Sequence, residues 1–352
     1  MTRIVATVGP ACSAKETLTE LLTAGVDLFR FTASKTPVAE LVSLADTVRV
    51  LAADLGRDVE LLLDLPGAKT RLTNDTYLDL AGVTELELRF DGGPTRPAGP
   101  LPVLGVDGRD PRDPLPEVGD VVVLGDGEDA LRVVAVAAGS CTAVPLTSGV
   151  LGIRRGVRFP GARGAARAET LTGYDEAGLR AVAGGPFDAV VISFAESAGL
   201  VERARAVLRD SAADGPPPAV VAKIETAAGA SAAAEIAGAA DGILLGRGDL
   251  LLDTGPIEFF AACRRVLDAA HAAGRPVLVG TQLLTSLATG WLPHRSELAY
   301  ASALIEEGVA GLMLAEETAG AADPLRAVVL LDQLRGVYAP ASARAALFPR
   351  RR

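Results

Sequence analysis

Short apolar runs alternate along the chain with longer stretches rich in alanine and leucine. The runs are apolar on both faces, which is typical of strands buried on both sides in a parallel sheet. Helical segments such as residues 16–25 and 259–274 lie between most of them and end at a glycine, a common helix C-cap. The predicted strands are residues 3–9, 27–31, 59–65, 189–194, 219–225, 242–247, 276–282 and 311–316. Eight strand–helix units predict an α/β fold, a (β/α)8 TIM barrel.

One interval departs from this alternation, because more than a hundred residues separate the third predicted strand from the fourth. It contains a Gly/Pro-rich loop, residues 91–120, followed by short alternating segments with tight turns. We predict a small all-β domain inserted after the third strand, at the barrel face where active sites lie, where it would act as a lid. The predicted division is a barrel of residues 1–73 and 159–340, an insert of residues 74–158 and a basic tail of residues 341–352.

Composition narrows the classes of function. Hydrophobic residues make up 49% of the 352 residues, and the net charge of -10 disfavours nucleic acid as a partner. Apolar runs stay below the ~18 residues of a membrane span, and the N-terminus enters a strand-like run without a signal peptide. Three scattered cysteines fit a reducing cytoplasm. With two histidines in the chain, a divalent metal would be held by carboxylates.

Polar and charged side chains gather at the C-terminal ends of the predicted strands, where barrel active sites are built. They include Thr7, Arg30, Asp64, Ser193, Lys223, Glu225, Arg247, Asp249, Thr281, Glu316 and Glu317. Lys223 and Glu225 are two residues apart on one strand, so they share a face. Glu225 and Asp249 follow adjacent strands and form a minimal Mg²⁺ or Mn²⁺ site. A metal with several cations nearby suits a phosphorylated substrate.

Each of these signals also has an ordinary structural explanation. A Lys-x-Glu pair at a strand end is commonly a surface pair, an RGD tripeptide is commonly a turn, and Lys69 and Arg71 alone would be solvated loop charges. The convergence of charge from six strand ends favours a functional site. Gly248 would let the backbone approach a ligand, and the N–H groups of Gly248 and Asp249 could hold a carboxylate.

Around these residues the sequence resembles the pyruvate kinase family. The block AKIETAAGASAAAEIAGAADGILLGRGDL, residues 222–250, is similar to the family pattern that runs from AKIEN to RGDLG. Further similar blocks, in the family's order, are TVGPAC (7–12), RFTAS (30–34), LLLDLPGAKTR (61–71), GDVVVLGDG (119–127), GVLGIRRGVRFPG (149–161), RPVLVGTQLLTSL (275–287), PHRSE (293–297) and EETAGAADPLRAV (316–328). The resemblance covers residues 2–338 and implies a phosphotransferase that converts phosphoenolpyruvate and ADP to pyruvate and ATP.

The resemblance also implies roles for individual residues. The implied catalytic residues are Lys223 and Arg30 on the phosphoryl group and Thr281 on the proton-donating side. Glu225 and Asp249 would hold Mg²⁺ or Mn²⁺, and substrate would contact Gly248, Asp249, Ser193 and Thr281. The implied nucleotide-binding residues are Pro10, Lys35, Arg71 and Arg155, with Asp126 reaching in from the insert. Such a density of positive charge fits a phosphoryl-transfer transition state.

Three positions depart from the members of the family that need K⁺. Thr32 replaces an asparagine, Leu65 replaces a threonine, and Lys69 replaces a glutamate. The Lys69 ammonium group can substitute for the K⁺ charge, so we predict activity without K⁺. The sequence ends soon after the eighth barrel helix, where the family's C-terminal domain would follow. We therefore expect no activation by a sugar bisphosphate, and any homodimer would form through the barrel.

Several positions near the site differ from the family pattern, and these differences leave two alternative functions open. LAEETA, GDLL and GTQ replace the family's LSGETA, GDLG and ATQ. A relative in a specialised pathway rather than glycolysis would use phosphoenolpyruvate or pyruvate with another acceptor, or form a C–C bond at a metal enolate. A non-catalytic phosphometabolite-binding protein is the other alternative. The presence of all the implied catalytic and metal-binding residues argues against it.

Overall fold

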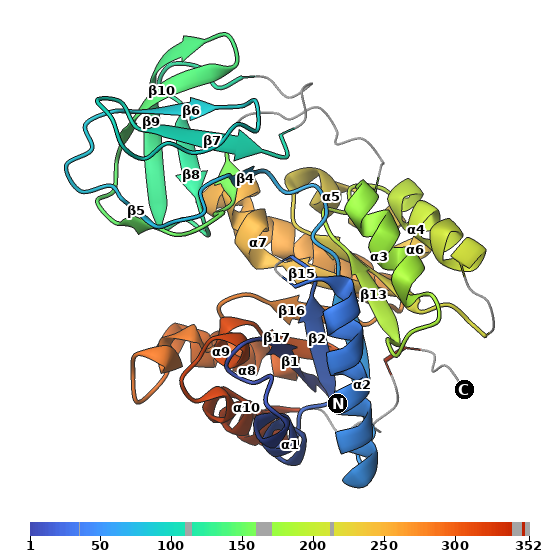
Figure 1. Ribbon diagram of the computed structural model, residues 1–352. Helices are drawn as coiled ribbons and strands as arrows, with labels where there is room; N and C mark the ends of the chain where they lie inside the picture. Colours follow the sequence, from blue (N-terminus) through green and yellow to red (C-terminus); the bar gives the residue numbers. More distant parts are fainter. Residues whose placement is uncertain (35, 110–114, 160–170, 212–214, 340–346, 349–352) are drawn as a thin grey trace.

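The computed structural model describes residues 1–34, 36–109, 115–159, 171–211, 215–339 and 347–348. Eight parallel strands close into a barrel in the order β1-β17-β16-β15-β14-β13-β3-β2 (Figure 1). All eight lie where the apolar runs predicted strands. Their bounds are β1 (Arg3–Val8), β2 (Leu28–Thr32), β3 (Glu60–Asp64), β13 (Ala189–Ile192), β14 (Ala219–Ile224), β15 (Gly242–Gly246), β16 (Val277–Gly280) and β17 (Gly311–Leu314).

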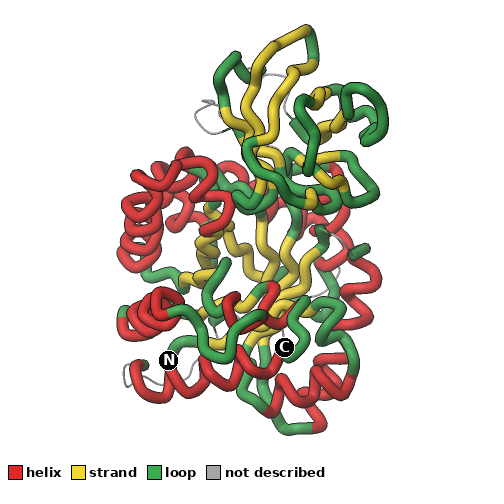
Figure 2. The backbone as a smooth tube through the Cα atoms, turned by 90° about the vertical axis from the view of Figure 1, so that its left-hand side faces the viewer, coloured by secondary structure: helices red, strands yellow, loops and turns green. Residues whose placement is uncertain are grey.

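Helices surround the barrel strands, and an all-β insert sits over one end of the barrel (Figure 2). The described helices are α1 (Lys15–Thr23), α2 (Val38–Asp54), α3 (Gly173–Val182), α4 (Ala198–Ser211), α5 (Ala227–Ser231), α6 (Ala233–Ala239), α7 (Arg247–Ala272), the 3₁₀ helix η1 (Thr285–Ala288), α8 (Arg295–Glu306), α9 (Glu316–Ala319) and α10 (Pro324–Tyr338). α7 begins directly after β15 and is broken at Gly255, whose φ is +73°. In the described residues, no helix combines the length and the apolar character that crossing a bilayer requires.

Successive side chains of each barrel strand point in turn into the lumen of the barrel and toward the surrounding helices. On β3, Leu61 and Leu63 pack into the core shared with the helices, whereas Leu62 belongs to a second cluster with Val5, Val221 and other inward residues. Because successive side chains of a strand point to opposite faces, Glu60 and Asp64 share the inward face of Leu62. An apolar middle layer therefore fills the lumen between a polar end at Asp64 and another at Glu60.

The insert is built from a seven-stranded sheet in the order β12-β8-β9-β10-β6-β7-β4 and a two-stranded sheet of β11 and β5. Its strands are β4 (Arg71–Leu72), β5 (Leu78–Asp79), β6 (Leu86–Arg89), β7 (Val103–Asp107), β8 (Val121–Leu124), β9 (Asp129–Ala137), β10 (Ser140–Pro145), β11 (Val150–Leu151) and β12 (Val157–Arg158). It has its own apolar core, with Leu88, Leu104 and Leu131 fully buried. The predicted fold class is confirmed. The boundaries at residues 74 and 158 stay a prediction, as does the division of the chain that they define.

Candidate active site

Asp64, at the end of β3, is the centre of a buried charge cluster and is 1% exposed. Arg30 of β2 donates from Nε to Asp64 Oδ2 over 2.7 Å, and the Nζ of Lys223 lies 3.3 Å from both carboxylate oxygens. The hydroxyl of Ser193, which follows β13, donates to the Leu65 carbonyl over 2.6 Å and lies 3.3 Å from Asp64 Oδ1. Burial alone would raise the pKa of Asp64, but the charges of Lys223 and Arg30 outweigh it and lower that pKa. Asp64 is thus ionised and holds both cations at the barrel mouth.

Glu225 is the second carboxylate that contacts Lys223, after Asp64. Its Oε1 is 3.5 Å from the Lys223 Nζ, and its Oε2 accepts a hydrogen bond of 3.2 Å from the backbone N–H of Phe194. Gly246 makes this position available, because a Cβ there would lie 2.5 Å from Glu225 Cγ. Burial raises the pKa of Glu225, Lys223 opposes the rise and the negative charge of Asp249 adds to it. Additional positive charge beside Glu225 would therefore be stabilising.

Asp249, in the first turn of α7, is held by two cations, Lys69 just before β4 and Arg158 on β12 of the insert. The Lys69 Nζ lies 2.7 Å from its Oδ2, and Arg158 donates from Nη2 to its Oδ1 over 3.2 Å. Burial would raise the pKa of Asp249, but Lys69 and Arg158 lower it from 3.8 to about 2. The sequence predicted Lys69 as a substitute for K⁺, and the structure places its ammonium group on the carboxylate of a predicted metal ligand.

Arg158 is a member of the charge cluster that the sequence did not single out. It is 8% exposed, lies on β12, and its guanidinium stacks 4.9 Å from the ring centroid of Phe194. Phe194 has a φ of +57°, and the same residue donates its backbone N–H to Glu225. Arg158 therefore contacts Asp249 directly. It also packs on Phe194, the residue whose backbone N–H donates to Glu225. The block that contains Arg158 was noted for its family resemblance, but no local pattern marked this side chain.

Glu225 and Asp249 fit a hard divalent cation by their chemistry. They follow the adjacent strands β14 and β15, and the charge of each bears on the other. Mg²⁺ is commonly bound by one or two carboxylates, with water and substrate oxygens completing its shell. In the part of the chain that the structure describes, no group of three or more His, Cys, Asp or Glu side chains is arranged to hold a metal. A metal at this pair would share Asp249 with Lys69 and Arg158.

Thr281 follows β16 in a left-handed conformation, with a φ of +72°, and Gln282 has a φ of +50°. Such backbone costs about 1–3 kcal/mol per residue and persists only where neighbouring groups fix it. Arg247 supplies this support, because its Nε donates to the carbonyl of Gly280 over 2.9 Å and its Nη2 donates to the carbonyl of Thr281. A Cβ at Gly248 would lie 3.2 Å from Thr281 Cγ2, so Thr281 faces the start of α7. Arg247 was seen at a strand end, but the sequence assigned it no role.

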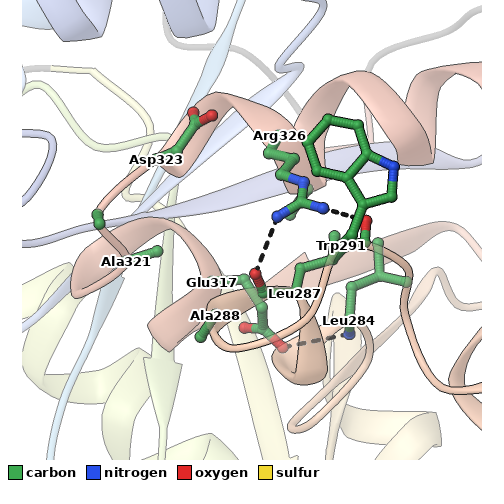
Figure 3. A pocket seen from close by; sticks show the side chains of 10 residues that line it. Leu284, Leu287, Ala288, Trp291, Glu317, Ala321, Asp323 and Arg326 are labelled. Carbon is green, nitrogen blue, oxygen red and sulfur yellow. Dashed lines mark hydrogen bonds between the residues drawn. The ribbon is translucent and has the colours of Figure 1, made fainter.

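Glu317, which follows β17 in helix α9, has a structural role. Both oxygens of Glu317 are used, since Oε1 accepts from the Thr285 hydroxyl over 2.7 Å and Oε2 from the Ala315 N–H over 2.7 Å. Beside it lies a cavity of about 210 Å³, whose other lining residues include Trp291 and Arg326 (Figure 3). Arg326 stacks 4.9 Å from the Trp291 ring centroid and donates to the Leu287 carbonyl over 3.3 Å. Apart from Glu317, none of the side chains predicted at the strand ends lines this cavity, and its charged groups Glu317, Asp323 and Arg326 form hydrogen bonds within the chain.

Comparison with known proteins identifies the family to which this barrel belongs. The family model described as the pyruvate kinase barrel domain matches residues 1–328. The chain belongs to the pyruvate kinase family. It is a pyruvate kinase-like phosphotransferase, which confirms the class of enzyme that the sequence predicted.

Relatives named pyruvate kinase match nearly the whole chain. The enzyme of Thermococcus litoralis is 31% identical over 342 residues, which are 95% of this chain and 68% of the relative. The enzyme of Aeropyrum pernix is 32% identical over 326 residues, 93% of this chain and 68% of the relative. Pyruvate kinase II of Salmonella typhimurium is 29% identical over 338 residues, 95% of this chain and 69% of the relative.

Of the residues that the family resemblance assigned to the nucleotide, Arg71 and Arg155 have described contacts near the insert. Arg71 donates to the Arg154 carbonyl over 3.3 Å, and burial lowers the pKa of Arg71 while the charge of Asp249 raises it. A Cβ at Gly248 would lie 3.8 Å from Asp126 Oδ1, so this carboxylate of the insert faces the start of α7. Arg155 packs beside Gly125 in the insert. Pro10 is exposed after β1, and Lys35 lies outside the described residues.

Proposed function

We propose that the protein transfers the phosphoryl group of phosphoenolpyruvate to ADP. The bond between phosphorus and the enol oxygen breaks, a bond from phosphorus to a β-phosphate oxygen of ADP forms, and the enolate takes a proton at carbon to give pyruvate. The observation that carries this proposal is the buried charge cluster at the barrel mouth, in a chain of the pyruvate kinase family.

Charge balance supports an anionic substrate. Four cations, Arg30, Lys69, Arg158 and Lys223, face three carboxylates, Asp64, Glu225 and Asp249. The cluster thus carries an excess positive charge in a buried site, where it would stabilise the negative oxygens of a phosphoryl group in transfer. Lys223 and Arg30 are already oriented by Asp64, so little reorganisation would be needed when substrate binds.

Thr281, Gly248 and Ser193 would complete the substrate site. Thr281 faces Gly248 at the start of α7, where the backbone N–H groups of Gly248 and Asp249 can receive the substrate carboxylate. The side chain of Thr281 would stand on the face from which the enolate is protonated. Arg71 and Arg155, on the insert side of the cluster, would meet the phosphates of the nucleotide, together with Pro10 and Lys35.

The metal in this proposal is Mg²⁺ or Mn²⁺, held by Glu225 and Asp249. When bound, it would supply Lewis acid stabilisation of the phosphoryl and enolate oxygens. The raised pKa of Glu225 supports a cation at this place, because burial and the charge of Asp249 leave that carboxylate short of positive partners.

We also propose that activity does not depend on K⁺. Both oxygens of Asp64 already contact cations of the chain itself, and the Lys69 ammonium adds a fixed positive charge at Asp249. Turnover should therefore be the same in K⁺-free tetramethylammonium buffer and in buffer with KCl. A Lys69→Met variant should be slower and partly restored by KCl. An unmodified enzyme that works only after KCl is added would refute this part of the proposal. The cytoplasmic location and a homodimer through the barrel stay predictions.

The main test is pyruvate release from phosphoenolpyruvate with ADP and Mg²⁺, alongside a Lys223→Met variant whose fold is checked by circular dichroism. Turnover that is lost in the variant supports the proposal. Binding of phosphoenolpyruvate without turnover would point to another acceptor, which a screen of nucleoside diphosphates and small hydroxylated metabolites would identify. Absence of binding to phosphoenolpyruvate and pyruvate would refute a phosphoenolpyruvate site altogether.

A further inference from the structure

The opposite end of the barrel from the charge cluster contains a buried carboxylate. Glu60, the first residue of β3, is 4% exposed and lies on the inward face of the strand. Its Oε1 accepts two backbone hydrogen bonds, from the N–H of Leu347 over 2.7 Å and from the N–H of Phe348 over 3.3 Å. Both donors come from the C-terminal segment of the chain, 287 and 288 residues away.

The ring of Phe348 fills the base of the lumen. It is 2% exposed and belongs to the inward-facing apolar cluster with Leu62 and Leu244, the middle layer of the barrel. The starts of several strands carry small residues that leave room for it. A Cβ at Gly242 would lie 3.0 Å from Phe348 Cε1, and Ala189 and Ala219 belong to the same cluster.

The path of the chain is compatible with this contact. α10 ends near the base, because Arg335 in its last turn pairs with Asp27 and donates to the Thr2 carbonyl over 3.4 Å. The eight steps from Ala339 to Leu347 can span about 26–29 Å when extended, which is more than a barrel radius. A buried carboxylate without its donors is costly, and so is an unfilled apolar cavity. The contact therefore meets two needs of the barrel base.

We propose that the base of the barrel is a docking site for an apolar dipeptide whose two backbone N–H groups donate to one carboxylate oxygen, and that Leu347–Phe348 of the same chain occupies it. Gly242 provides the space for the aromatic ring, and Glu60 recognises the backbone. Docking closes the end of the barrel that lies away from the chemistry. Leu347 and Phe348, which lie within the segment that the sequence predicted as a basic tail, thus contribute to the barrel core.

The test is thermal unfolding of the full chain with Phe348→Ala, against Phe260→Ala as a matched control. Phe260 lies on α7 and is 68% exposed. We expect Phe348→Ala to lower Tm by about 5 °C, which is the effect of removing a buried phenylalanine in a chain of this size. The control should change Tm by about 1 °C or less. KM for phosphoenolpyruvate should be the same in both variants. Equal Tm for the two variants would overturn the proposal.

A second measurement separates the docking site from a general packing effect. A synthetic peptide with the sequence of residues 344–352 is added to the full-length Phe348→Ala protein. Because the variant leaves the hollow open, the peptide should restore much of the lost Tm, and a peptide in which alanine replaces its phenylalanine should not. Equal effects of the two peptides would overturn the proposal.

Sedimentation of the unmodified protein tests the source of the occupant. A wild-type dimer that dissociates on Phe348→Ala would show that the segment comes from a second copy, against docking within one chain. Tm values that are independent of protein concentration would support docking within one chain.

Discussion

The pair of cations on Asp249 predicts a specific dependence of stability on pH. Lys69→Met removes the charge that contributes most to lowering the pKa of Asp249 from 3.8 to about 2. A shift of about two pKa units corresponds to about 2.5 kcal/mol of interaction in the folded state. Arg158 remains in the variant and retains part of it. We therefore expect Lys69→Met to lower the free energy of unfolding at pH 7 by about 1.5 kcal/mol.

The sign of the pH dependence follows from the lowered pKa. A carboxyl group with a lower pKa in the folded state stabilises the protein above its unfolded pKa, and that stabilisation is lost as pH falls through the folded value. The wild-type protein should therefore lose this contribution between about pH 4 and pH 2. The variant has less of it to lose, so the difference between the two proteins should shrink as the solution is acidified.

Urea unfolding at pH 7, 5, 4 and 3, followed by circular dichroism, would measure this difference. Lys15→Met is the matched control, because Lys15 is exposed at the start of α1 and its replacement should change stability by less than about 0.5 kcal/mol at every pH. The reasoning is refuted if Lys69→Met destabilises the protein equally at pH 7 and pH 3, or no more than the control does.

Three further variants test the geometry of the site. Arg158→Gln should tighten Mn²⁺ binding to the substrate-free protein about tenfold in electron paramagnetic resonance titrations, because a metal then competes with one cation fewer for Asp249; weaker binding would contradict this competition. Gly246→Ala should lower kcat about 100-fold without loss of circular dichroism, since its Cβ would lie 2.5 Å from Glu225 Cγ and displace that carboxylate; unchanged kcat would show that the position of Glu225 is not critical. Arg247→Gln should release the left-handed backbone after β16 and slow proton exchange at the methyl group of pyruvate, measured by deuterium incorporation; exchange at the normal rate would exclude this support.

The fold was predictable because its signals are local. Each barrel strand is an apolar run between helices, and the insert was visible as an interval too long for one helix. The candidate residues Lys223, Glu225 and Asp249 were found because strand ends in a barrel converge, whatever the details of packing.

Other features could not be predicted because they depend on contacts between distant parts of the chain. Arg158 lies on a strand of two residues, and its contact with Asp249 is decided by how the insert sits on the barrel. Asp64 was noted as a strand end, but its position between Arg30 and Lys223 follows from barrel closure. The docking of Phe348 against Gly242 involves a segment whose composition indicated a basic tail.

The position of Lys69 and Arg158 links movement of the insert to the charge of Asp249. Lys69 lies just before β4 and Arg158 on β12, the first and last strands of the insert in the chain, and both contact Asp249. Any rotation of the insert away from the barrel must therefore separate opposite charges, so the opening angle and the electrostatic potential at Asp249 change together. By thermodynamic reciprocity, a ligand that competes for this carboxylate favours an open insert, and a molecule that wedges the insert open increases the affinity of Asp249 for added cations. Opening of the insert and binding of a cation at this one carboxylate would thus favour each other.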